Sequence, residues 1–156
     1  MKLTLVLLLL ALTCCSSDEI AKVVVFLSLA GTEADSCPPD WINFQSHCYS
    51  LKKIARNWNA AEADCQTHGS ESHLASIRSE KENAFGSFIA GENDPGFPVW
   101  IGLFSFKGGG RSYVRWTDNT NVDYTAWADG DPGKRGYCVE ISADVSLARL
   151  AEDYKA

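Results

Sequence analysis

The sequence predicts a small α+β domain, with two helices followed by the strands of an antiparallel sheet. Three observations support this prediction. The hydrophobic residues recur with a helical period between residues 54 and 91, they alternate between residues 99 and 141, and a long polar loop interrupts the alternating part. The chain of 156 residues has room for one domain, and its 46% of hydrophobic residues is ordinary for a globular protein.

The first 36 residues are interpreted as a leader and a linker. Lys2 gives the amino terminus a positive charge, and an almost uninterrupted apolar run follows from Leu3 to Leu12. This run is shorter than the ~20 residues that cross a bilayer, so it indicates a signal peptide over residues 1–17 and no membrane span. Residues 18–36 are predicted to be a linker, although Ser28-Leu29-Ala30 also resembles a cleavage site.

Charge and cysteine content restrict the partners. The formal net charge is −6, and Lys and Arg form no cluster that could neutralise phosphates, which excludes nucleic acid as a partner. Six cysteines in a short chain with a leader indicate a secreted, extracellular protein with disulfides. Loss of the signal peptide leaves four cysteines, whose three possible pairings stay open at this point: Cys37, Cys48, Cys65 and Cys138.

The predicted domain opens with a β-hairpin and two helices. Cys37 and Cys48 lie at the two ends of the hairpin, and a disulfide closing so short a ring would contribute roughly 3 kcal/mol. The first helix is predicted to end at Gly69, and its apolar stripe consists of Ile54, Trp58, Ala61 and Cys65. The second is predicted from a Ser79–Glu82 capping box to Gly91, with a buried face of Phe85, Phe88 and Ile89.

Strands and a loop complete the domain. Val99 to Leu103 is an apolar run of strand length, and three glycines then lead into the alternating run from Ser112 to Trp116. The polar loop extends from Asn121 to Lys134, and alternation returns from Tyr137 to Ile141. The tryptophans Trp58, Trp100 and Trp116 fall on apolar faces and are expected in the core.

These pieces resemble, in order, a C-type lectin-like domain of the long form, which has an additional N-terminal hairpin with its own disulfide. The resemblance covers residues 37–141. Its matching segments are Cys37 to Trp41, Cys48-Tyr49, Trp58 with Ala61 to Cys65, His73 to Ile77 with Ser79 to Glu82, Trp100-Ile101-Gly102-Leu103, Trp116-Thr117-Asp118, Tyr124 with Trp127, and Cys138 to Ile141. The resemblance implies the C-type lectin-like fold, a Cys37–Cys48 disulfide, and a carbohydrate or an extracellular protein as ligand.

The resemblance ends at Ile141. The family continues into a Trp-Asn-Asp segment, a partner cysteine, a last strand and a final cysteine, and this sequence contains none of them. The resemblance therefore implies that Cys65 and Cys138 are unpaired, with a direct Cys65–Cys138 bond as the alternative. The final strand is expected to be missing, and the tail 142–156 is predicted to be helical from the spacing of Leu147, Leu150, Ala151 and Tyr154.

The resemblance also locates a candidate ligand site in the polar loop. Sugar-binding members hold Ca²⁺, which takes 6–8 oxygen ligands, partly through a Glu-Pro-Asn or Gln-Pro-Asp triplet. The corresponding triplet is Asp131-Pro132-Gly133, in which Asp131 is the candidate metal ligand and Gly133 has no side-chain oxygen. Asp129, Asp131 and Pro132 form the candidate ligand-binding set. A bound Ca²⁺ cofactor is therefore not expected of this chain, although the family can use one.

Three functions remain on these observations. The first is a secreted carbohydrate-binding module of the C-type lectin type, and the second is a calcium-independent module that binds a protein. The third is a truncated product without binding activity. An enzyme is not expected, and no catalytic residue is assigned, because the sequence has no His-Glu-x-x-His pair, no Gly-x-Ser-x-Gly and no phosphate-binding loop.

Overall fold

The computed structural model describes residues 24–30, 37–53, 56–93, 99–129, 131–132, 138–141 and 148–151. These residues form two helices and eight strands. The elements in chain order are β1 (Val24–Ala30), β2 (Ile42–Phe44), β3 (His47–Lys53), α2 (Trp58–Gln66), β4 (Ser72–Leu74), α3 (Glu80–Asn93), β5 (Val99–Gly108), β6 (Arg111–Trp116), β7 (Cys138–Ile141) and β8 (Ala148–Ala151). The predicted α+β class is confirmed. No helix among the described residues is long and apolar enough to span a membrane.

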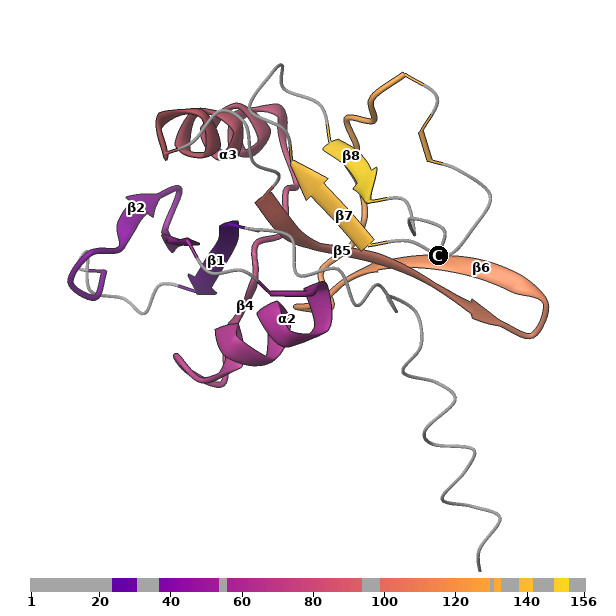
Figure 1. Cartoon of the computed structure of the whole chain (residues 1–156), viewed down its shortest axis with the longest axis horizontal. Coiled ribbons are helices and arrows are strands. Elements are labelled where there is room, and N and C mark those ends of the chain that lie inside the picture. Colours follow the sequence, from indigo (N-terminus) through magenta and orange to yellow (C-terminus); the bar gives the residue numbers. More distant parts are fainter. Residues whose placement is uncertain are drawn as a thin grey trace, which may run out of the picture.

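One sheet runs through the molecule between the two helices (Figure 1). Its strand order is β2-β3-β1-β5-β7-β8, while β4 pairs with β1 and β6 pairs with β5. All pairs are antiparallel except β1 and β5, which are parallel over two residues. The sheet is therefore held together by long-range pairing between distant parts of the chain.

Strand β1 comes from the segment that the sequence interpretation assigned to a linker. Residues 24–30 pair antiparallel with β3 along its whole length, from Val24 opposite Lys53 to Ala30 opposite His47. The same strand pairs with β4, where Ser28 lies opposite His73. An apolar segment with β-branched residues gains ladder hydrogen bonds on both sides in this place, which a solvated linker could not provide.

The tail also differs from the sequence prediction. In place of the helix expected within residues 142–156, residues 148–151 form β8, which pairs with β7 from Cys138 opposite Ala151 to Ile141 opposite Ala148. Leu147 and Tyr154, on which the helical spacing partly depended, lie outside the described residues. The edge of β7 offers unpaired N–H and C=O groups, and a strand satisfies them where a helix cannot.

The core consists of two apolar clusters to which β5 contributes alternate residues. Val99, Ile101 and Leu103 belong to one cluster, whereas Trp100 belongs to the other, together with Trp58. This alternation is the period of two expected for a strand that is covered on both faces. Trp58, Trp100 and Trp116 are all buried, as predicted. The indole of Trp58 also donates a hydrogen bond to the carbonyl of Ile101, at 2.8 Å.

Both helices end at other residues than predicted. Helix α2 is capped by the side chain of Asn57, which accepts from the amide of Ala60 at 2.9 Å, and it ends at Gln66 before Gly69. Helix α3 continues past Gly91 to Asn93. The apolar spacing fixes which residues face the core, but the helix ends depend on local hydrogen bonds at the caps.

The start of α3 contains half of the predicted capping box. The Ser79 hydroxyl accepts from the amide of Glu82 at 3.2 Å, whereas the Glu82 carboxylate accepts from the amide of Arg78. Phe85 and Ile89 pack in the larger core cluster as predicted, but Phe88 is 61% exposed. The buried positions Glu82, Ile89 and Ala90 lie on one side of the helix, and at 100° per residue Phe88 points to the opposite side.

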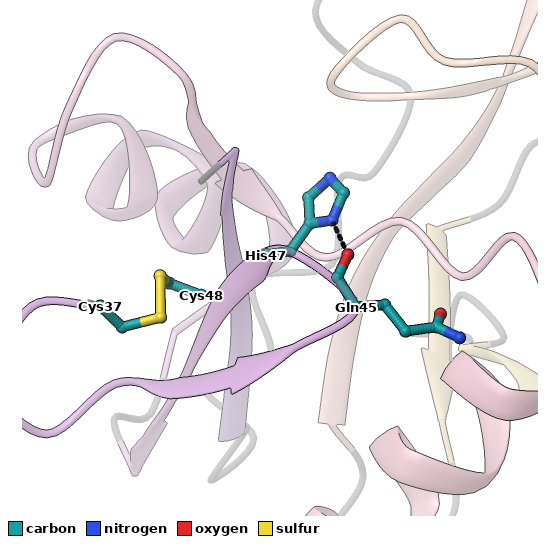
Figure 2. The surroundings of a disulfide bond; sticks show 4 residues. All are labelled: Cys37, Gln45, His47 and Cys48. Carbon is teal, nitrogen blue, oxygen red and sulfur yellow. Dashed lines mark hydrogen bonds between the residues drawn. A yellow bond between two sulfur atoms is a disulfide. The ribbon is translucent and has the colours of Figure 1, made fainter. Parts of the chain in front are cut away.

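The predicted N-terminal hairpin and its disulfide are confirmed (Figure 2). The sulfur atoms of Cys37 and Cys48 are 2.01 Å apart and their Cα atoms 5.4 Å apart. Gln45 and Ser46 form the two-residue turn with φ of 48° and 63°, as a type I′ turn requires. The His47 ring lies at the turn, with its Nδ1 donating to the carbonyl of Gln45 at 3.0 Å.

The other two domain cysteines differ from each other. Cys65 is a free thiol with no exposed surface, as expected, and this excludes the alternative Cys65–Cys138 bond. Cys138 is disulfide-bonded and not a free thiol, in contrast to the expectation from the resemblance. The resemblance could not indicate this bond, because the partner cysteine that the family supplies is missing from this sequence.

We expect Cys65 to be unreactive in the folded protein. Burial raises the pKa of its thiol, with smaller contributions from Glu62 and Asp64, so the reactive thiolate is scarce at neutral pH. Alkylation with iodoacetamide, followed by peptide mass analysis, should modify Cys65 only after unfolding. An introduced thiol at the exposed turn position, Ser70→Cys, should react without denaturant. Equal rates for the two thiols in the native state would contradict the packing described for α2.

A second prediction concerns the pairing of β1. Ser28 lies between β3 and β4, so its N–H points to a paired strand on whichever side it faces. Ser28→Pro removes that N–H, and we expect roughly 1–3 kcal/mol of lost stability in urea unfolding of the protein. Ser28→Ala keeps the amide and serves as the control. The same urea midpoint for both variants, or a mature amino terminus at Gly31, would show that β1 is not part of the folded protein.

Candidate functional site

The candidate site is the loop between β6 and β7, of which the structure describes residues 117–129 and 131–132. The loop starts at a fixed point, since the Thr117 amide donates to the carbonyl of Gly102 at 3.0 Å. A Cβ atom at Gly102 would lie 2.6 Å from both the Leu74 carbonyl oxygen and the Thr117 hydroxyl. Only glycine therefore allows β4, β5 and the start of the loop to approach so closely.

Asp118 holds the first turn of the loop. Its carboxylate accepts from the Ser76 hydroxyl at 2.7 Å, from the Thr120 amide at 2.9 Å and from the Thr120 hydroxyl at 2.6 Å. Asn119 has a φ of 60°, in the left-handed region that asparagine tolerates better than most residues. This network joins the loop to the segment before α3, which is distant in the sequence.

The middle of the loop is held by aromatic packing. Val122, Tyr124 and Trp127 pack against the larger core cluster, and Tyr124 and Trp127 line a shallow apolar depression above Trp116. Partial burial raises the pKa of the Tyr124 phenol, with a smaller contribution from the charge of Glu80. The middle of the loop is therefore positioned by its packing against the core.

The three predicted site residues lie together in the last described turn of the loop. Asp129 and Pro132 are exposed and Asp131 is half-buried. The Asp131 amide donates to the carbonyl of Ala128 at 3.0 Å, and the Asp131–Pro132 peptide bond is cis. Gly133 and residues 135–137 lie outside the described residues.

These residues do not make a metal site by themselves. Within the described ranges, no three His, Cys, Asp or Glu side chains lie close enough together to hold a metal ion. Ca²⁺ takes 6–8 oxygen ligands, and the turn supplies two carboxylates, from Asp129 and Asp131. Among the described residues of the turn, these two carboxylates are fewer oxygen donors than Ca²⁺ takes.

Sequence reasoning missed the residues that position this site. In the sequence, Asp118 stands out only as part of the Trp116-Thr117-Asp118 segment that resembles the family, because its partner Ser76 is 42 residues away. The Gly102 contact was equally hidden, since the glycine lies inside a run that predicts an ordinary strand. A glycine inside such an apolar strand is a signal for close backbone approach, and it could have indicated this junction.

The comparisons with known proteins agree with this geometry. The family model described as "Lectin C-type domain" matches residues 54–153. The snaclec alboaggregin-B subunit alpha of Trimeresurus albolabris is 38% identical over 114 residues, which are 72% of each chain.

Two solved structures carry the same fold. The cow C-type carbohydrate-recognition domain of CD23, determined in the presence of an oligosaccharide, has a TM-score of 0.62 and 31% identity, covering 76% of this chain and 87% of that one. A calcium-independent type II antifreeze protein has a TM-score of 0.61 and 32% identity, with 74% and 84% coverage.

The anchoring role of Asp118 leads to a prediction. Asp118→Ala leaves the Ser76 hydroxyl and the Thr120 amide without their acceptor, so we expect roughly 1–3 kcal/mol of lost stability in urea unfolding. Asp123→Ala removes an exposed carboxylate of the same loop and should change the stability by less than about 0.5 kcal/mol. If the two variants unfold alike, the network does not hold the loop.

Proposed function

Because this chain belongs to the C-type lectin domain family, we propose that it is a secreted recognition module that binds a carbohydrate through the turn at residues 128–132. The observation that carries the proposal is the way in which the loop is held. The Asp118 network fixes its start and the packing of Tyr124 and Trp127 fixes its middle. The exposed Asp129 and Pro132 are thereby presented at a defined place on the surface, so little ordering entropy is lost on binding.

The proposed ligand is a neutral glycan. Its hydroxyl groups can donate to the carboxylates of Asp129 and Asp131, and its apolar ring face can pack beside the aromatic residues of the loop. The solved CD23 domain supports this class of ligand, since it was determined with an oligosaccharide present. The module is proposed to work with weak calcium binding or none, because the triplet ends in Gly133 and no acid precedes Cys138 closely.

A second candidate is a calcium-independent module that binds an extracellular protein. The observation that favours it is the donor set, which does not fit Ca²⁺, together with the similarity to a calcium-independent antifreeze protein. The two candidates share the loop and differ in the ligand. A glycan is a small ligand held by a few hydrogen bonds, whereas a protein partner would also cover the surface around the loop.

We predict that the purified secreted chain binds Ca²⁺ with a dissociation constant of about 10⁻³ M or weaker. Isothermal titration with calcium chloride measures this directly, and Asp131→Ala should leave the result unchanged. The control is Glu71→Ala, which removes an exposed carboxylate outside the loop. Binding in the micromolar range that Asp131→Ala abolishes would contradict the weak calcium binding proposed here.

Retention on a glycan array, with and without a chelator, separates the two candidates. The proposal expects retention that the chelator does not abolish and that Asp129→Ala combined with Asp131→Ala reduces. Binding of no glycan by a folded, monodisperse preparation would overturn the carbohydrate part. Pull-down of an extracellular protein that depends on the same two carboxylates would then establish the second candidate.

A further inference from the structure

The β5–β6 hairpin has one face on which aromatic and basic side chains alternate. In the antiparallel pairing Phe104 lies opposite Arg115, Phe106 opposite Tyr113, and Gly108 opposite Arg111. Directly opposed residues project from the same face of a sheet, as do residues two apart on one strand. We call this the hairpin face, made of Phe104, Phe106, Arg111, Tyr113 and Arg115. The hairpin projects well beyond the helices (Figure 1).

The aromatic side chains of the hairpin face are held in place by contact with each other. The rings of Phe106 and Tyr113 are stacked, with centroids 5.3 Å apart and planes inclined by 21°. The Arg115 guanidinium carbon lies 5.7 Å from the centroid of Phe106. Tyr113 is nevertheless 46% exposed, and Arg111 and Arg115 are exposed as well. A large, rigid and partly apolar surface is thus open to solvent.

The charge of the hairpin is opposite to that of the chain. Residues 99–117 contain Lys107, Arg111 and Arg115 and no acidic residue, although the whole chain carries a net charge of −6. Within the part of the chain that the structure describes, neither Arg111 nor Arg115 takes part in an ion pair. Along β6 the order is Arg111, Tyr113, Arg115, with neighbours about 6–7 Å apart, so a phenol ring stands between two cations.

We infer that the hairpin face is a binding site for a sulfated polysaccharide. The planar guanidinium groups can each donate two parallel hydrogen bonds to an oxyanion such as sulfate, which lysine cannot do. The exposed ring of Tyr113 offers a flat surface to the apolar face of the intervening sugar ring. A linear ligand that alternates sulfates with sugar rings matches the alternation of cations and ring along β6.

Other anionic partners fit this face less well. An acidic peptide that added a strand to β6 would take its affinity from the backbone edge, and it would leave the stacked rings unused. A nucleic acid requires more cations than the three that the hairpin carries. The site lies on a different element from the loop of the proposed function, so either can fail without the other.

Surface plasmon resonance of the full secreted chain on immobilised heparin tests the proposal. Arg111→Ala and Arg115→Ala should each weaken binding about tenfold. Each should also lower the slope of log K against log salt by about one. Lys81→Ala, which removes an exposed lysine on α3, should change neither quantity. Tyr113→Ala should weaken binding while leaving the salt slope unchanged, because it removes stacking and no charge.

The comparison ligands complete the test. Chemically desulfated heparin should bind at least about tenfold more weakly than heparin, because the oxyanions are gone. Poly-glutamate and duplex DNA should also bind more weakly. No binding to heparin at low salt would overturn the inference. So would equal binding of the desulfated form or of the other polyanions, or an effect of Lys81→Ala as large as that of Arg115→Ala. Circular dichroism confirms that each variant is folded.

Discussion

The pairing of β1 with three other strands is the constraint on which the rest of the structure depends. In the sheet order, β1 lies between the N-terminal hairpin of β2 and β3 and the group formed by β5, β7 and β8. Among the described strands, β3 pairs only with β2 and β1. The backbone hydrogen bonds of β1 therefore join the two halves of the sheet, and this fold needs residues 24–30.

Strand β5 carries the two apolar clusters on its opposite faces and connects them to both candidate binding surfaces. Its buried half, around Gly102, receives the start of the loop through Thr117. Its other end leaves the core with β6 and presents the stacked pair of Phe106 and Tyr113. One strand thus holds the start of the loop that carries the acidic turn, and it also forms half of the hairpin with the basic, aromatic face. The two surfaces differ in charge, so they suit ligands of different chemistry.

The loop between β6 and β7 departs from the calcium-binding pattern that the resemblance to C-type lectins implies. The fold is that of a C-type lectin domain, and the Asp131–Pro132 peptide bond in the loop is cis. The residues that would complete a calcium shell are replaced by Gly133 and by Arg135, Gly136 and Tyr137. The described part of the scaffold keeps its shape through packing and backbone pairing.

The sequence by itself determined the α+β class, the hairpin with its Cys37–Cys48 disulfide, the core tryptophans and the position of the acidic turn. These features depend on local spacing and on motifs that are close together in the chain. Only the tertiary structure decided that residues 24–30 and 148–151 are strands and that Cys138 is disulfide-bonded. It also decided that Asp118 accepts a hydrogen bond from Ser76. The strand register of the hairpin places Arg111, Tyr113 and Arg115 on the same face as Phe106. Each of these features depends on a partner far away in the sequence or on a strand register. A short apolar segment forms a strand only where the unpaired N–H and C=O groups of an open sheet edge can pair with it.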